Sequence, residues 1–177
     1  TQKTKDAKFT ENMPKVLDRI TKEIVNPDGV KHSDRAVSEE FINSTLNSFG
    51  ITKLNDYIHV QRQVFDTLLN EGFFTNTETR SRIDINAESG MIVETNKSGI
   101  FETFSLNNYG RLGKFKKFAK LATVRNLPDA IKFGHLVMDD AENIHDSADN
   151  NKKFAYIEYA TEVDGKEIVL KLAIKKS

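Results

Sequence analysis

Apolar residues in the first part of the chain recur every three or four positions, which is the spacing of one helix face. The pattern predicts three helices, over residues 13–25, 35–49 and 54–70. Pro14 suits the first turn of the first helix, and Gly50 and Gly72 follow the other two as stop signals. Three helices with short links can bury one shared core, so residues 1–80 are expected to form a helical domain.

The pattern changes after Gly72 to a mixture of short strands and short helices. A polar loop over 75–82 leads to a predicted hairpin, whose strands cover 82–86 and 91–95. Three short helices are then predicted, over residues 97–105, 116–125 and 126–134. Residues 82–177 are therefore expected to form a second domain of mixed composition.

The end of the chain carries the clearest hairpin signal. Residues 154–163 and 167–175 flank Asp164 and Gly165, a dipeptide favoured in type I′ turns. On the second strand Leu170 alternates with Lys171, so one face is apolar and the other is polar enough to be a working surface. The predicted class is α+β: a helical domain followed by helices packed on a small antiparallel sheet.

Composition excludes several function classes. Lys plus Arg equals Asp plus Glu, at 26 each, so any contact with nucleic acid must come from a local patch. The absence of Cys excludes a disulfide scaffold, a Cys-ligated zinc site and a cysteine nucleophile. No apolar run approaches the roughly 18 residues of a membrane span. The chain begins with Thr1, which suggests a piece of a longer polypeptide.

One stretch departs from this neutral balance. No acidic residue lies between Glu102 and Asp129, while six basic residues do. From this stretch we expect a rim that binds RNA or phosphate, formed by Arg111, Lys114, Lys117 and Lys120. The alternative is an ordinary solvated helix face. Tyr156 is a candidate for stacking on a base, against the alternative of half-buried packing in a strand.

An ordered series of short sequences runs through residues 82–176. It comprises RIDIN at 82–86, GIFETF at 99–104, KLATVRNLPDAI at 120–131, GHL at 134–136, ENIH at 142–145, KFAY at 153–156, VDG at 163–165 and LAIKK at 172–176. The series resembles the third of the large polyvalent protein associated domains, which occur in phage and mobile-element polyproteins and at the ends of bacterial toxins. The resemblance implies a relationship to the barnase, endoU, colicin and RelE-like nucleases. It also implies helices on a curved antiparallel sheet and metal-independent RNA cleavage.

Such cleavage needs groups that exchange protons and fixed donors for a crowded phosphate. His135 and His145 are the candidates for proton exchange, against the alternatives of a strand-end His and a loop His bonded among Asp residues. Lys171 is the candidate phosphate clamp, although an ordinary solvent-facing Lys fits the pattern equally well. Thr103 is a candidate for bonding phosphate, and a cap-type role is its alternative.

No metal or other cofactor is expected, because the acidic residues at 139–149 do not follow the spacing of a calcium loop. The leading hypothesis is an endoribonuclease toxin or effector domain from a phage, mobile-element or polymorphic toxin polyprotein, as in contact-dependent inhibition. Its expected partners are RNA, with tRNA as one candidate, and an immunity protein or antitoxin. Its expected place of action is the cytoplasm, after delivery into a target bacterial cell. The alternative is a non-catalytic module that binds protein or nucleic acid.

Overall fold

Two β-sheets form the framework of the computed structural model, which describes residues 15–17, 20–25, 36–52, 54, 56–104, 113–142 and 153–175. The larger sheet has the strand order β2-β7-β6-β5 and is antiparallel throughout. These strands are β2 (Ile20–Val25), β7 (Lys166–Lys175), β6 (Lys153–Val163) and β5 (His135–Glu142). The smaller sheet has the order β1-β4-β3, with β1 parallel to β4. Its strands are β1 (Lys15–Leu17), β4 (Ile92–Asn96) and β3 (Ser81–Ile85).

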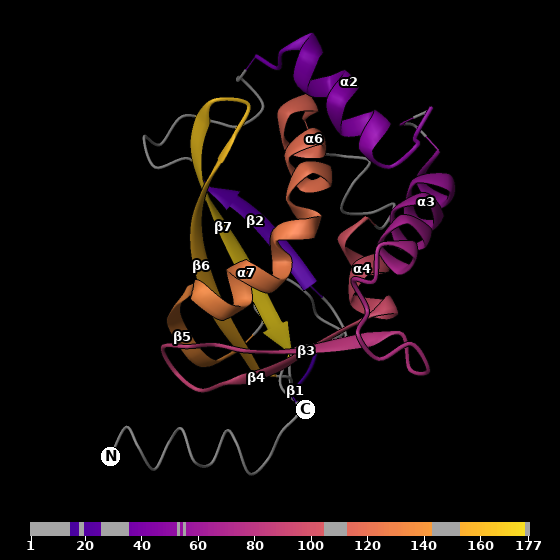
Figure 1. Cartoon of the computed structure of the whole chain (residues 1–177). Coiled ribbons are helices and arrows are strands. Elements are labelled where there is room, and N and C mark those ends of the chain that lie inside the picture. The colour runs from indigo at the N-terminus through magenta and orange to yellow at the C-terminus, as the bar shows by residue number, and fades with distance from the viewer. Residues whose placement is uncertain are drawn as a thin grey trace.

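The helices gather on one side of the larger sheet (Figure 1). They are α2 (Glu39–Ser48), α3 (Tyr57–Asn70), α4 (Lys97–Thr103), α6 (Lys114–Thr123) and α7 (Leu127–Phe133), with the 3₁₀ turn η2 (Val124–Asn126) between the last two. This arrangement confirms the α+β class. The helices at 54–70, 97–105, 116–125 and 126–134 and both hairpins are also confirmed, with shifted ends. No helix among the described residues is long and apolar enough to cross a bilayer.

The helix expected at 13–25 is wrong, because this segment contains strands β1 and β2. Ile20 and Ile24 are four residues apart, a spacing that places them on one face of a strand as well as of a helix. The segment is also rich in β-branched residues, which favour strands. β2 pairs with β7 from Ile20 opposite Ile174 to Val25 opposite Val169, so tertiary pairing decides the ambiguity.

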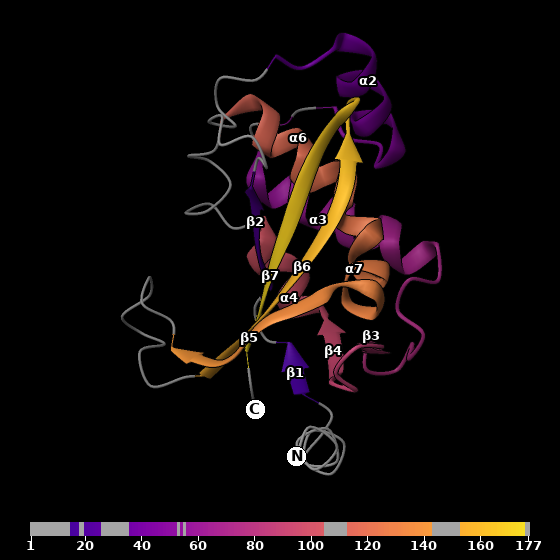
Figure 2. The ribbon, with the colours of Figure 1, turned by 90° about the vertical axis from the view of Figure 1, so that its left-hand side faces the viewer.

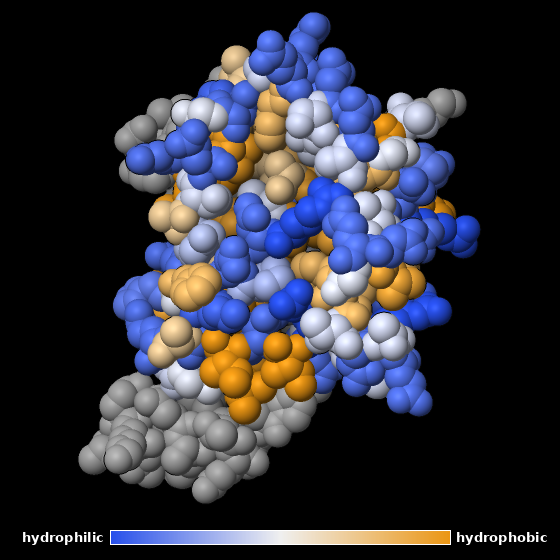
Figure 3. Space-filling view, viewed as in Figure 1, coloured by the Kyte–Doolittle hydropathy of each residue, from blue (hydrophilic) through white to orange (hydrophobic). Residues whose placement is uncertain are grey.

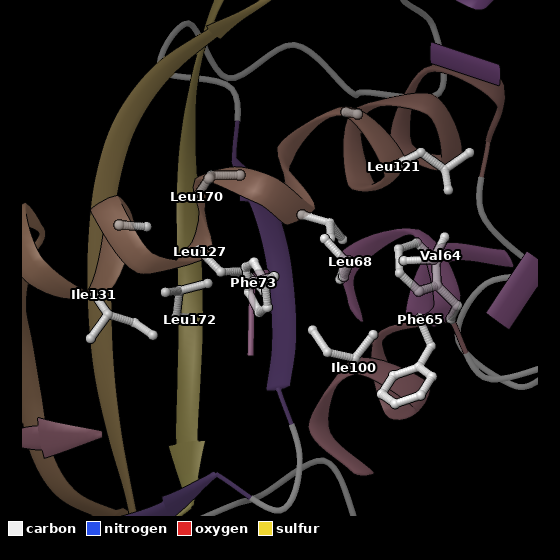
Figure 4. Packing of buried hydrophobic residues seen from close by; sticks show 14 of the residues in the cluster. Val64, Phe65, Leu68, Phe73, Ile100, Leu121, Leu127, Ile131, Leu170 and Leu172 are labelled. Atoms are coloured by element: carbon white, nitrogen blue, oxygen red, sulfur yellow. The ribbon is translucent and has the colours of Figure 1, made fainter. Parts of the chain in front are cut away.

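One hydrophobic core lies between the larger sheet and the helices. Figure 4 shows side chains from β7, α7, α6, α3, α4 and the segment after α3: Leu170, Leu172, Leu127, Ile131, Leu121, Val64, Phe65, Leu68, Ile100 and Phe73. All of these side chains are buried. The core and the strand pairs thus join segments from both sides of residue 81. The division into one domain of residues 1–80 and a second of residues 82–177 stays a prediction.

The tip of the terminal hairpin is tied to the start of α2. Asp164 and Gly165 have φ values of 51° and 71°, as the predicted type I′ turn requires. The Asp164 carboxylate accepts hydrogen bonds from the backbone N–H and the hydroxyl of Ser38, at 2.9 and 2.6 Å. These bonds lower the pKa of Asp164. Ser38 in turn caps α2, which therefore begins four residues later than predicted.

A buried asparagine fixes the β3–β4 turn against the start of β5. Asn86 is fully buried, and its Nδ2 donates to the carbonyls of Ile131 and Gly134, at 2.8 and 3.0 Å. Its Oδ1 accepts from the backbone N–H and the hydroxyl of Ser89, at 2.9 and 2.8 Å. The backbone N–H of Ala87 adds a bond to the carbonyl of Lys132. The turn and the start of β5 are therefore held together by several buried bonds.

We expect Gly134→Ala to destabilise the fold by about 3 kcal/mol, because overpacking against an immobile backbone is costly. A Cβ at position 134 would collide with the carbonyl oxygen of Ala130 and with Cγ2 of Ile157. Urea unfolding measures the loss. Gly72→Ala is the matched control: its φ is +78° and nothing lies near its Cβ, so it costs only about 1 kcal/mol of backbone strain. Equal losses in the two variants would contradict the steric explanation.

Candidate functional site

The outer face of the larger sheet carries a row of polar residues. In register, His135 of β5 lies opposite Glu158 of β6, and Glu158 lies opposite Lys171 of β7. Residues paired in this way project from the same face of a sheet. Figure 2 shows this face toward the viewer, and no described helix crosses β6 and β7 there. The sheet thus brings two of the predicted site residues, His135 and Lys171, into one row.

Lys171 is held against an aromatic ring. Its Nζ lies 5.6 Å from the ring centre of Tyr156, and the side chain is half-buried. The Tyr156 ring stacks on Phe154, with 6.5 Å between the ring centres. Neighbouring residues of β7 on the opposite face, Leu170 and Leu172, are in the core. The ammonium group is therefore anchored by its strand and positioned over Tyr156, the third predicted site residue of this face.

His135 begins β5 and forms a close pair with a carboxylate. Its Nδ1 lies 2.7 Å from Oε2 of Glu88, which belongs to the β3–β4 turn. The two side chains are 65% and 50% exposed. An ionised carboxylate only accepts hydrogen bonds, so Nδ1 must carry the proton in this pair. Among the described residues, the other ring nitrogen, Nε2, has no hydrogen-bond partner.

Thr103 and Lys120 lie in the helix layer and not on the outer face. The Thr103 hydroxyl is buried and donates to the Gly99 carbonyl within α4, a bond inside the helix that differs from the cap-type alternative, and binding of phosphate by Thr103 stays a prediction. Lys120 is 3% exposed, and its Nζ donates to the Thr103 carbonyl at 3.4 Å. Burial lowers the pKa of Lys120 to about 8, and the charge of Lys116 adds to the effect. The placement of Lys120 on an exposed rim is therefore wrong, because its amine is interior.

The remaining predicted basic residues are divided between the helix layer and the undescribed part of the chain. Lys114 is exposed and Lys117 is half-buried, both on α6, which packs on the inner face of the sheet (Figure 1). Arg111 and His145 lie outside the described residues. Binding of phosphate by Arg111, Lys114 and Lys117 stays a prediction, and so does proton exchange by His145. The outer face and α6 are thus separate surfaces.

Two carboxylates beside the predicted residues were not found from the sequence. The sequence contains enough information to place Glu158 beside Lys171. The two residues are equally far from the Asp164-Gly165 turn, so counting outward along the two strands pairs them. No local pattern in the sequence indicates the contact of Glu88 with His135, because it joins a turn to a strand that begins 47 residues later. Among the described residues, no group of three or more His, Asp or Glu side chains is placed to hold a metal ion.

Comparison with known proteins adds no assignment. No family model, no curated protein and no solved structure matches the chain. The resemblance of residues 82–176 to a nuclease-related domain stays a prediction that depends on the quoted residues.

Proposed function

We propose that the outer face of the larger sheet binds RNA and cleaves it without a metal ion. The observation that carries this proposal is the row of His135, Glu158 and Lys171 on one sheet face that no described helix covers. Neighbouring strands are about 5 Å apart, so three long side chains in one row can converge on a single phosphodiester. A carboxylate, an imidazole and an ammonium are the types of group that this reaction needs.

In the proposed reaction Glu158 accepts the proton of the 2′-OH as that oxygen attacks phosphorus. The bond between phosphorus and O2′ forms, and the bond between phosphorus and O5′ breaks. Lys171 stabilises the negative charge on the crowded phosphate, and Tyr156 offers a ring for stacking on a base. Protonated His135 gives its proton to the leaving O5′. The products are a 2′,3′-cyclic phosphate and a 5′-OH, so atoms and charges balance.

Purified protein is expected to cut a short single-stranded RNA in the presence of a chelator. The fragments should end in a 2′,3′-cyclic phosphate and a 5′-OH, which mass spectrometry distinguishes from the products of a metal-dependent cut. The matched control is the same oligonucleotide with one 2′-deoxy sugar, which should resist cleavage at that position because the attacking oxygen is missing. Failure of the folded protein to cut any RNA, including tRNA, would refute the enzyme proposal.

The biological setting of the proposal is a toxin or effector domain that acts in the cytoplasm of a target bacterium. Expression of the chain inside bacteria should then stop growth, and a neighbouring immunity gene should restore it. Variants that remove cleavage in vitro should also remove the growth arrest. Arrest by a cleavage-deficient variant would separate toxicity from the proposed chemistry.

A binding module is the second candidate function, and the edge strand β3 favours it. β3 lies at the end of the order β1-β4-β3, and its Ile83 and Ile85 are 54% and 53% exposed. Figure 3 shows hydrophobic residues gathered at the lower margin of this view, over β3 and β4. An edge strand with exposed apolar side chains suits addition of a strand from a protein partner. Such a module would neither cut RNA nor stop growth.

A further inference from the structure

We propose that Glu88 is a positioning residue that fixes His135 with Nε2 as its reacting nitrogen. The inference rests on the proposed function, because it assigns the atom of His135 that delivers the proton. It adds a residue from outside the larger sheet to the site. Glu88 would act only through His135 and would not touch the RNA.

The atoms of the pair support this assignment. Oε2 of Glu88 lies 2.7 Å from Nδ1, so the carboxylate accepts the Nδ1 hydrogen in both the neutral and the charged ring. Within the part of the chain that the structure describes, Nε2 has no hydrogen-bond partner. In the charged ring Nε2 therefore carries the proton that can be given away. In the neutral ring Nε2 is the nitrogen that accepts a proton.

The backbones on both sides of the pair are fixed, which distinguishes it from an ordinary surface pair. Exposed pairs contribute little when two flexible side chains must be ordered to form them. Here the turn that carries Glu88 is held by the buried bonds of Asn86 to the carbonyls of Ile131 and Gly134. His135 directly follows Gly134, which is buried and has no room for a Cβ beside Ala130 and Ile157. The two Cα positions are thus set before any substrate binds.

Fixing the ring has a direct chemical consequence. An exposed histidine on a strand end rotates about two bonds and exchanges between two tautomers. A carboxylate on Nδ1 selects one tautomer and one ring orientation, so fewer arrangements are unproductive when the phosphate binds. Glu88 should therefore affect the turnover rate more than the affinity for RNA.

The first test reads the tautomer directly, without any RNA. Nitrogen-15 NMR of the neutral His135 ring should show the hydrogen on Nδ1 in the original protein. Glu88→Ala should give a mixture of tautomers, whereas Glu88→Gln should largely keep the Nδ1 form because its amide oxygen still accepts. Glu78→Ala is the matched control: Glu78 is exposed in the preceding turn, and only its backbone N–H forms a hydrogen bond. An unchanged tautomer in Glu88→Ala would overturn the proposal.

The second test is a double-mutant cycle on the rate of RNA cleavage. Glu88→Ala should lower kcat about 10-fold with little change in KM, a fraction of the roughly 10²–10⁴-fold that general acid catalysis supplies. In a His135→Gln background the same substitution should change nothing further, because a positioning residue acts through its partner. Losses that multiply in the double variant would overturn the proposal. A protein that cuts no RNA would refute the proposed function, whereas the NMR result would still decide whether Glu88 fixes the ring.

Discussion

Replacing Lys171 by methionine is expected to slow RNA cleavage by about 10²–10³-fold, the usual effect of removing one preorganised donor from a developing negative charge. Methionine keeps most of the length and apolar character of the lysine stem, so contact with the Tyr156 ring is retained while the charge is lost. The main effect should appear in kcat, because the charge on phosphate increases as the crowded intermediate forms. The fold should be unaffected, because Lys171 is only half-buried.

Initial rates on an RNA with one cleavable position measure this loss. Affinity for an uncleavable 2′-deoxy analogue should fall much less. The slope of log affinity against log salt concentration should become shallower by about one, which corresponds to the loss of one phosphate contact. Lys132→Met is the matched control, because Lys132 is an exposed lysine on α7 with its Nζ over the Phe133 ring. Equal effects of the two substitutions would show that Lys171 contributes only to overall charge. The assignment of Lys171 as the clamp would then be wrong.

Lys120→Met is expected to stabilise the protein at neutral pH by about 2 kcal/mol. Burial lowers the pKa of Lys120 from 10.5 to about 8. A shift of this size means that folding raises the free energy of the charged amine, relative to the neutral amine, by about 3 kcal/mol. Loss of the hydrogen bond to the Thr103 carbonyl offsets about 1 kcal/mol of the gain.

The sign of the pH dependence follows from the lowered pKa. Below pH 8 the amine is charged in both states, and the folded state bears the full cost of burying it. Between pH 8 and 10.5 the unfolded chain binds more protons than the folded one, so rising pH stabilises the original protein. The advantage of Lys120→Met should therefore be complete at pH 7 and largely gone near pH 10.5.

Urea unfolding of both proteins at a series of pH values measures the difference. Lys114→Met is the matched control: this lysine begins α6 and is exposed, so its substitution should give a small difference that does not vary with pH. A destabilised Lys120→Met variant at pH 7 would mean that interactions of the charged amine outweigh its desolvation. Because Lys120 lies away from the outer face, RNA cleavage by the variant should be unchanged.

Local signals in the sequence were sufficient for several elements. The Asp164-Gly165 turn needs positive φ at both positions, and few dipeptides supply it so readily, so the terminal hairpin and the two faces of β7 could be predicted. α3 has caps and spacing that fit only a helix. Residues 20–25 carry a spacing common to helix and strand, and only pairing with β7 decides between them.

Only the part of the candidate site that lies on the terminal hairpin, β6 and β7, could be predicted from the sequence. Lys171 and Tyr156 follow from alternation along the two strands, and Glu158 follows from the register. The burial of Lys120 could not be inferred from its position in a basic stretch, because α6 is buried around more of its circumference than an amphipathic helix. The pairing of Glu88 with His135 needs two sheets to meet, which no local pattern describes.

The pairing of β2 with β7 also has a consequence for the order of folding. Ile20 lies opposite Ile174, so these partners are separated by nearly the whole length of the chain. Contacts between such distant residues close large loops and slow the search for the native state. On the ribosome β2 has to wait until β7 has been synthesised and has emerged before the two strands can pair. The larger sheet should therefore be completed only after β7 is available, and any nuclease activity of its outer face would be delayed until then.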